Sequence, residues 1–236
     1  MRHEHKHSQI PCCDSAQDAW SDYYISAAGA LSESYGMTGR AAARDAIRLY
    51  AEMLGRERRE FLVKHGRKPN LYNIFLHGGP LPAGCRTRKE WIRHTSQEVF
   101  VNISSCPCAE CWLKRNKAET GKMFCEEFYP AYIFTAASPR AQVNVGRELV
   151  NEGDTFCRLS IYLRPANISV EERRIYFEEF DPDYTEPDGE LPVQEADYAK
   201  LAATLESCFI SCARARLGDE AAELVRFACG VKEGLK

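Results

Sequence analysis

The sequence lacks any apolar run of about 18 residues, the length that a helix needs to cross a bilayer. It is also poor in glycine and proline, with 15 and 11 in 236 residues, and has no Gly/Ser-rich or Pro-rich stretch long enough to separate two cores. With a hydrophobic share of 44%, this composition excludes collagen-like order and a disordered chain. We expect a flexible tail over residues 1–14 and one folded domain over residues 15–236.

We also expect no signal peptide, because residues 1–13 are polar and rich in histidine where such a peptide needs an apolar stretch. We therefore expect a cytoplasmic protein. The 11 cysteines would then be mostly reduced, which favours buried thiols, metal ligands or a reactive thiolate over a disulfide framework. His3, His5 and His7 alternate in the tail, and we expect no catalytic role for them.

Positive charge is not concentrated in this chain. The 31 basic and 34 acidic side chains give a formal net charge of −3, so we expect neither nucleic acid nor membrane as a partner. A Rossmann fingerprint and a phosphate-binding loop are also absent, so no nucleotide cofactor is implied. The expected partner is a small-molecule substrate, and the sequence leaves a homo-oligomer open.

Apolar periodicity predicts helices at both ends of the domain. Stripes with helical spacing cover residues 15–34, 38–65, 194–217 and 219–228. Residues 98–104 alternate as a half-buried strand does, and residues 141–150 and 155–163 are predicted to form a hairpin through a tight turn at 151–154. The predicted fold class is therefore α+β, with helices flanking a small antiparallel β-sheet in a single domain.

Two further segments are predicted to lack regular structure. Residues 69–88 are rich in Gly and Pro and are expected to form a loop. Residues 170–190 carry nine acidic and two basic side chains, and their second half is expected to be an exposed, solvated surface.

Three thiols within six positions make residues 106–111 the most informative segment of the chain. Cys106, Cys108 and Cys111 are crowded at the end of a predicted strand, so at least two sulfur atoms lie within reach of one ion or one substrate. Zinc normally takes four soft or borderline ligands, which a metal site here would draw from these thiols and from Cys125, Cys157, His77 or His94. We favour a thiolate used in chemistry, and zinc stays an alternative.

The predicted hairpin turn places carboxylates close to another thiol. Glu152 and Asp154 precede Cys157, whose side chain is expected to face the core together with Leu159 and Ile161. A turn carboxylate near a thiol is suited to orient a water molecule or to accept a proton during attack on a carbon–nitrogen centre. Turn chemistry alone also explains Asp and Gly at these positions, so both interpretations stay open.

Residues 102–165 combine a strand leading into the Cys-Pro cluster, a strand that contains Arg147, and the sequence Glu152-Gly153-Asp154-Thr155-Phe156-Cys157-Arg158. In these features, which cover about a quarter of the chain, the protein resembles the L-2-amino-thiazoline-4-carboxylic acid hydrolase family. The Gly-Asp-x-x-Cys end is also similar to 4-vinyl-reductase-type ligand-sensing domains, some of which hold zinc through cysteines. Cys108 is a thiol beyond the family pattern.

The resemblance implies a hydrolase acting on carbon–nitrogen bonds of the cyclic amidine type, which opens a five-membered ring and needs no cofactor. The nucleophile would be Cys106 or Cys111, with a pKa lowered by a helix N-terminus or by a nearby cation such as Lys114, Arg115 or Arg147. The candidate base is Asp154 or Glu152, and Cys157 is a wall of the site or a second thiol. The expected groups for the substrate carboxylate are Arg147, Arg158 and Asn102.

Two alternatives belong to other classes of protein. The first is a zinc-containing small-molecule-binding or sensor domain without catalysis, with the metal on Cys106, Cys108 and Cys111. The second is a thiol redox protein, in which one thiolate attacks a bound disulfide or peroxide and its neighbour resolves the product.

Overall fold

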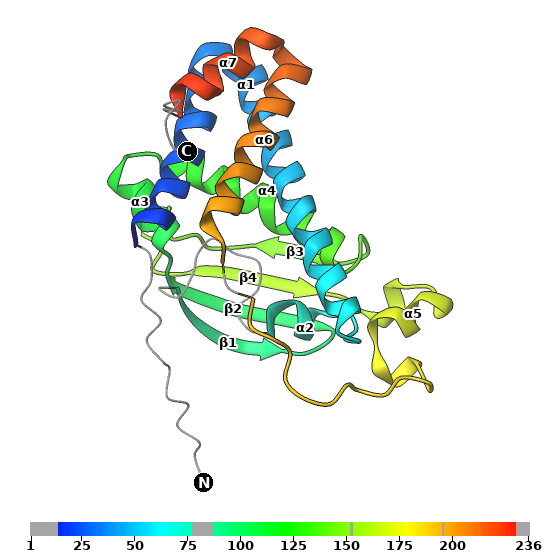
Figure 1. Ribbon diagram of the computed structural model, residues 1–236. Helices are drawn as coiled ribbons and strands as arrows, with labels where there is room; N and C mark the ends of the chain where they lie inside the picture. The colour runs from blue at the N-terminus through cyan, green and yellow to red at the C-terminus, as the bar shows by residue number, and fades with distance from the viewer. Residues whose placement is uncertain (1–13, 77–86, 152, 195, 230–236) are drawn as a thin grey trace.

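The computed structural model describes residues 14–76, 87–151, 153–194 and 196–229. Its helices lie on one side of a four-stranded antiparallel sheet, so the predicted α+β class is confirmed (Figure 1). In chain order the elements are α1 (Asp14–Lys64), α2 (Leu71–Phe75), β1 (Arg88–His94), β2 (Glu98–Ser105), α3 (Pro107–Lys114), α4 (Ala118–Ala136), β3 (Gln142–Val145), β4 (Cys157–Tyr162), η2 (Pro165–Asn167), α5 (Val170–Tyr176), η3 (Glu178–Phe180), α6 (Tyr198–Leu217) and α7 (Asp219–Ala228).

The two helices predicted at the start of the domain join into the long α1, with a break at Gly36. This residue has φ 56° and ψ −132°, a conformation that glycine adopts without the strain that a side chain adds. The predicted gap between residues 34 and 38 therefore corresponds to a bend rather than to a loop.

The helical core lies where α1 packs against α4 and α6. The rings of Trp20 and Tyr24 in α1 surround Phe124 of α4, with centroid distances of 5.4 and 5.0 Å. Further along, a Cβ atom on Gly55 would lie only 2.1 Å from Thr135 Oγ1, so the backbones of α1 and α4 approach closely there. A buried aromatic layer and a glycine contact thus fix α4 between α1 and the sheet.

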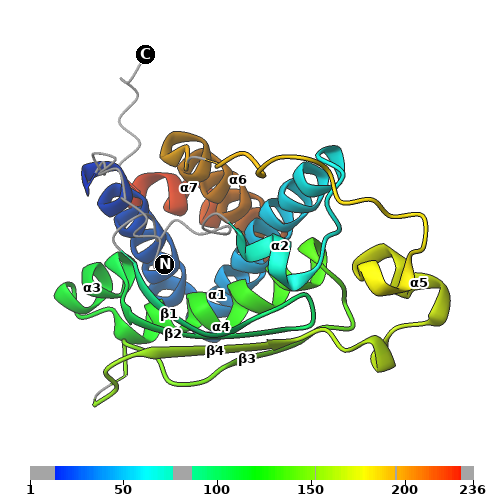
Figure 2. The ribbon, with the colours of Figure 1, turned by 90° about the horizontal axis from the view of Figure 1, so that it is seen from below.

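The sheet has the strand order β1-β2-β4-β3, and the helices cover one of its faces (Figure 2). On the covered face Val101 of β2 stands opposite Leu159 of β4, and Val99 stands opposite Ile161; all four side chains are buried. Cys157 follows the same alternation two residues before Leu159, as predicted. The covered face therefore carries the thiol of β4 toward the helices.

Strand β1 was not predicted: residues 89–97 were left unassigned, because the strand carries mostly exposed and charged side chains. Such a pattern suits an edge strand, whose residues have little core to face. The hairpin prediction was right in pairing but wrong in its turn: β3 ends at Val145, and residues 146–156 form a wider loop, of which position 152 lies outside the described residues. That loop returns over the end of the sheet.

The acidic segment keeps most of its side chains exposed, as expected, but it is also attached to the rest of the domain. Lys68 is only 6% exposed, and its Nζ donates to Asp181 at 2.6 Å and to the backbone oxygen of Arg174 at 2.5 Å. Arg67 pairs with Glu186. Two cations just after α1 therefore hold the exposed segment against the domain, an attachment that the sequence did not predict.

The described helices include no segment long and apolar enough to cross a membrane. The predicted tail with His3, His5 and His7 lies outside the described residues, as does His77. Helix α7 has the predicted bounds, whereas α6 begins at Tyr198, later than predicted, because Asp197 caps it by accepting a hydrogen bond from the backbone of Lys200.

Candidate functional site

A small enclosed cavity of about 20 Å³ lies between the covered face of the sheet, α4 and the start of α3. Its volume is enough for about one water molecule. Three thiols, one carboxyl group and one arginine line it together with aliphatic and aromatic side chains: Ile103, Cys106, Cys125, Tyr129, Val145, Glu148, Cys157, Arg158 and Leu159. The structure thus brings Cys106 and Cys157, which are far apart in the sequence, to one cavity.

Cys106 occupies the N-cap position of α3, directly after β2. Its backbone is extended, with φ −138° and ψ 115°, and Pro107 begins the helix. Proline is favoured at the first helical position because its missing N–H would have no partner there and its fixed φ suits a helix. The strand and the proline together fix the partly buried sulfur of Cys106 at the positive end of α3.

The environment of Cys106 favours its thiolate. A hydrogen bond from the Cys108 thiol, helped by the backbone N–H groups of Ala109 and Cys108, lowers the pKa of Cys106 to about 7, although burial opposes the shift. The thiol does not make a regular capping hydrogen bond, but these amides lie close enough to stabilise negative charge. Of the predicted causes, the helix N-terminus is therefore present.

Lys89 of β1 adds a cation on the face of the sheet that borders the cavity. It stands opposite Ile103, which lines the cavity, so both side chains share the covered face of the sheet. Burial lowers the pKa of Lys89, and its attraction to the Cys106 sulfur opposes that shift. Lys89 was not among the predicted site residues, because the strand β1 that carries it was not predicted.

Glu148 is the carboxyl group of the cavity, and it was not among the predicted site residues. Its side chain is 3% exposed, and its Oε2 atom has no hydrogen-bond partner among the described residues. Burial, with a smaller contribution from the charge of Glu126, raises its pKa to about 7. The only feature of the sequence that points to burial of Glu148 is its position directly before the apolar Leu149 and Val150.

Asp154 holds the loop that carries Glu148. Its Oδ2 atom accepts hydrogen bonds from the backbone N–H of Glu148 and from Nδ2 of Asn151, both at 3.2 Å. Asp154 is thus placed to position Glu148 rather than to touch the cavity itself. Glu152, the other candidate base, lies outside the described residues.

Cys157 and Cys125 face the same cavity, but their surroundings favour the protonated thiols. Burial raises the pKa of Cys157 to about 11, although the backbone N–H of Leu149 donates to its sulfur at 3.1 Å. Burial also raises the pKa of Cys125. At neutral pH these residues are walls of the cavity, and Cys106 is the thiol disposed to ionise.

Cys111, the other candidate nucleophile, is placed elsewhere. Its thiol donates to Asp22 at 3.6 Å and receives a hydrogen bond from Arg115 at 3.5 Å. Burial and the charge of Asp22 raise its pKa. Cys111 is not among the residues that line the cavity, while Asp22 and Arg115 line a separate open groove of about 590 Å³.

The residues proposed for zinc do not converge in the part of the chain that the structure describes. No group of three His, Cys, Asp or Glu side chains is arranged there to hold a metal ion. Cys106 and Cys108 are in contact, but the third thiol of the set, Cys111, lies against Asp22. His94 is on β1, where it contacts the backbone oxygen of Tyr72 at 3.1 Å.

Arg147, Arg158 and Asn102 form a separate polar group around Phe156. The guanidinium groups of both arginines lie 5.1 Å from the centre of this ring. Nε of Arg158 also donates to Oδ1 of Asn102 at 3.2 Å. Arg158 borders the cavity, and its charged end is engaged with Asn102 and Phe156. The charge of Lys89 interacts with the Cys106 sulfur.

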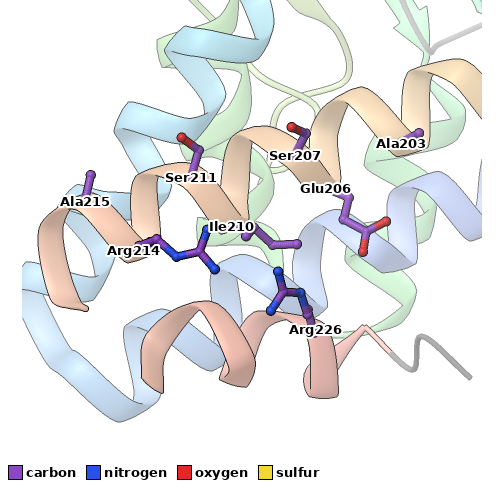
Figure 3. Close-up of a pocket in the computed structure, with 8 residues that line it drawn as sticks. All are labelled: Ala203, Glu206, Ser207, Ile210, Ser211, Arg214, Ala215 and Arg226. Atoms are coloured by element: carbon purple, nitrogen blue, oxygen red, sulfur yellow. The ribbon is translucent and has the colours of Figure 1, made fainter. Parts of the chain in front are cut away.

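A larger groove of about 560 Å³ lies between α6 and α7 (Figure 3). Ser207 and Ser211 border it, and its two cations are paired: Arg214 with Asp219 at 2.7 Å and Arg226 with Glu223. It is open to solvent, and none of its lining residues has a thiol. The thiol cavity is therefore the better candidate for chemistry, although it is much smaller.

No protein-family model, curated protein or solved structure matches this chain. The class of the site consequently rests on its own geometry. A partly buried thiol at a helix N-terminus, facing a buried carboxyl group with a raised pKa, is typical of sites that use a cysteine nucleophile and an acid–base partner.

Proposed function

We propose that this protein is a cysteine-dependent hydrolase of a small carboxylate that contains a C=N and a C–S bond, as in the opening of a thiazoline-carboxylate ring. The observation that carries the proposal is the pairing of Cys106 with Glu148 at one cavity. With pKa values of about 7, these two groups supply a nucleophile and a proton donor at neutral pH.

The first step forms a bond between the Cys106 sulfur and the ring carbon that lies between nitrogen and sulfur. Glu148 gives its proton to the ring nitrogen through the water molecule in the cavity, and the bond from that carbon to the ring sulfur breaks, which leaves this sulfur as a thiolate of the opened ring. In the second step the Glu148 carboxylate takes a proton from water, whose oxygen adds to the same carbon. The bond to Cys106 then breaks, which returns the Cys106 thiolate, and the remaining hydroxyl proton passes to the thiolate of the opened ring to give the carbamoyl product.

The size of the cavity assigns places to the reactants in this scheme. A volume of about 20 Å³ holds one water molecule but no five-membered ring. We therefore place the hydrolytic water inside the cavity, beside Glu148, and the ring outside the cavity, against the partly buried Cys106. We assign Lys89, whose charge interacts with the Cys106 sulfur, to the substrate carboxylate together with Arg147 and Arg158.

The test is turnover of 2-amino-thiazoline-4-carboxylate, followed by mass spectrometry of the carbamoyl product. Cys106→Ser is expected to reduce turnover to the level of the blank, and Glu148→Gln to reduce kcat by about 100-fold, as for the loss of a general acid–base group. Cys111→Ser is the matched control and retains turnover. Equal rates for the parent protein and Cys106→Ser would disprove the assignment.

The alternative of a zinc-containing sensor domain is tested by zinc content and by alkylation of the thiols. One equivalent of zinc that survives dialysis, with the thiols at positions 106, 108 and 111 unreactive toward an alkylating agent, would favour a zinc-containing binding domain without catalysis. A metal-free protein that one equivalent of alkylating agent inactivates at Cys106 favours the enzyme.

A further inference from the structure

The cavity is too small for a ring but has room for a molecule close to the size of water. Hydrogen peroxide is such a molecule, and its reaction with a protein thiol needs a thiolate and benefits from a donor for the leaving oxygen. Cys106 and Glu148 provide these groups, and both line the same enclosed space. The unpartnered Oε2 atom of the buried Glu148 is available to hold a small polar guest there.

A second thiol is already in contact with the first. Cys108 is the second residue of α3, 5% exposed, and its thiol donates a hydrogen bond to the Cys106 sulfur. A resolving cysteine must reach the oxidised sulfur without a large movement of the chain, and Cys108 is the thiol whose interaction with Cys106 is strongest and is two residues away in the sequence. In the proposed hydrolysis, the Cys108 thiol has no role other than this hydrogen bond to Cys106.

We propose that Cys106 and Cys108 form a redox pair that reduces hydrogen peroxide, with Glu148 as the proton donor. The Cys106 thiolate attacks one peroxide oxygen, so that a sulfur–oxygen bond forms while the oxygen–oxygen bond breaks. The departing oxygen takes the proton of Glu148 and leaves as water. Sulfur is oxidised by two electrons to the sulfenic acid, and the peroxide is reduced.

Cys108 then attacks the sulfur of the sulfenic acid. A disulfide bond forms, the sulfur–oxygen bond breaks, and the hydroxide leaves with the proton of Cys108 as a second water molecule. One peroxide and two thiols thus give one disulfide and two water molecules. A dithiol reductant is the class of co-reactant that returns the pair to its starting state. This reaction does not depend on the proposed hydrolysis.

The experiment uses the full, reduced chain with one equivalent of hydrogen peroxide, followed by intact mass and peptide mapping. The expected product has lost two hydrogen atoms and carries a bond between Cys106 and Cys108. In Cys108→Ser the sulfenic acid at Cys106 persists and is trapped by dimedone. Glu148→Gln slows oxidation of Cys106 by about 100-fold at neutral pH.

Cys125→Ser and Cys157→Ser are the matched controls, because both residues line the cavity but neither is assigned to the pair. Both variants are expected to form the same disulfide as the parent protein. A chain that stays reduced, or a disulfide that joins Cys106 to Cys125 or Cys157, would overturn the proposal. Because thiazoline turnover is measured separately, failure of the hydrolase proposal leaves this result standing, and the reverse also holds.

Discussion

The buried carboxyl group of Glu148 makes the stability of this protein depend on pH in a way that one substitution removes. Glu148→Gln keeps the size and shape of the side chain but has no proton to lose. The raised pKa of Glu148, about 7 against an ordinary 4.5, means that the folded protein holds this proton more tightly than the unfolded chain does.

The size and sign of the effect follow from proton linkage. Below pH 4.5 the group is protonated in both states, and its contribution to stability is fully present. Between that pH and about 7 the unfolded chain ionises while the folded protein does not, so the free energy of unfolding falls as the pH rises. The complete loss amounts to at most about 3 kcal/mol, and it ends once the folded group ionises as well.

Urea unfolding at several pH values between 5 and 8 measures this difference. We expect the stability of Glu148→Gln relative to the parent protein to increase with pH by up to about 3 kcal/mol, and most of the change to occur below pH 7. Glu60→Gln is the matched control, because Glu60 is an exposed residue of α1. Parallel stability curves for Glu148→Gln and the parent protein would refute the raised pKa.

Three further predictions address the site and the core. Alkylation of Cys106 by iodoacetamide should reach half of its maximal rate near pH 7, and a midpoint near the ordinary thiol value of 9 would contradict the stabilised thiolate. Asp154→Ala should lower kcat by about 10-fold, by releasing the Glu148 backbone, without changing the alkylation of Cys106; a changed alkylation rate would mean a wider structural role. Gly55→Ala should cost about 1–3 kcal/mol in thermal or urea unfolding because of its approach to α4, whereas Gly29→Ala, with no atom nearer than 3.8 Å, should cost nothing; equal effects would contradict this packing.

Much of the fold, but only part of the candidate site, could be predicted from the sequence. Alternating and helical patterns identified β2, β4 and the long helices, because each of these elements buries one regular face. The exposed edge strand β1 has no such face, and Lys89 was missed with it. Glu148 was missed because its burial and raised pKa come from a wide loop folding over the sheet, a long-range arrangement that no local motif records.

The candidate nucleophiles illustrate the same distinction at a finer scale. Cys106 and Cys111 are equivalent by composition, and both belong to the cluster that the sequence emphasised. Their roles separate because Cys106 precedes the first turn of α3, whereas Cys111 lies within the helix and faces Asp22. Which of two neighbouring thiols ionises is thus decided by helix geometry and by charges from α1.

At the N-cap of α3, the atom that would best stabilise the helix differs from the atom that can act as a nucleophile. Helices usually begin with Ser, Thr, Asp or Asn, whose oxygen caps the free amides and adds about 1 kcal/mol of stability. Here that position holds Cys106, which makes no regular capping bond. Replacing its sulfur by the oxygen of serine should give a more heat-resistant but chemically inert protein, and such a gain would identify the thiol as a residue kept at the expense of folding.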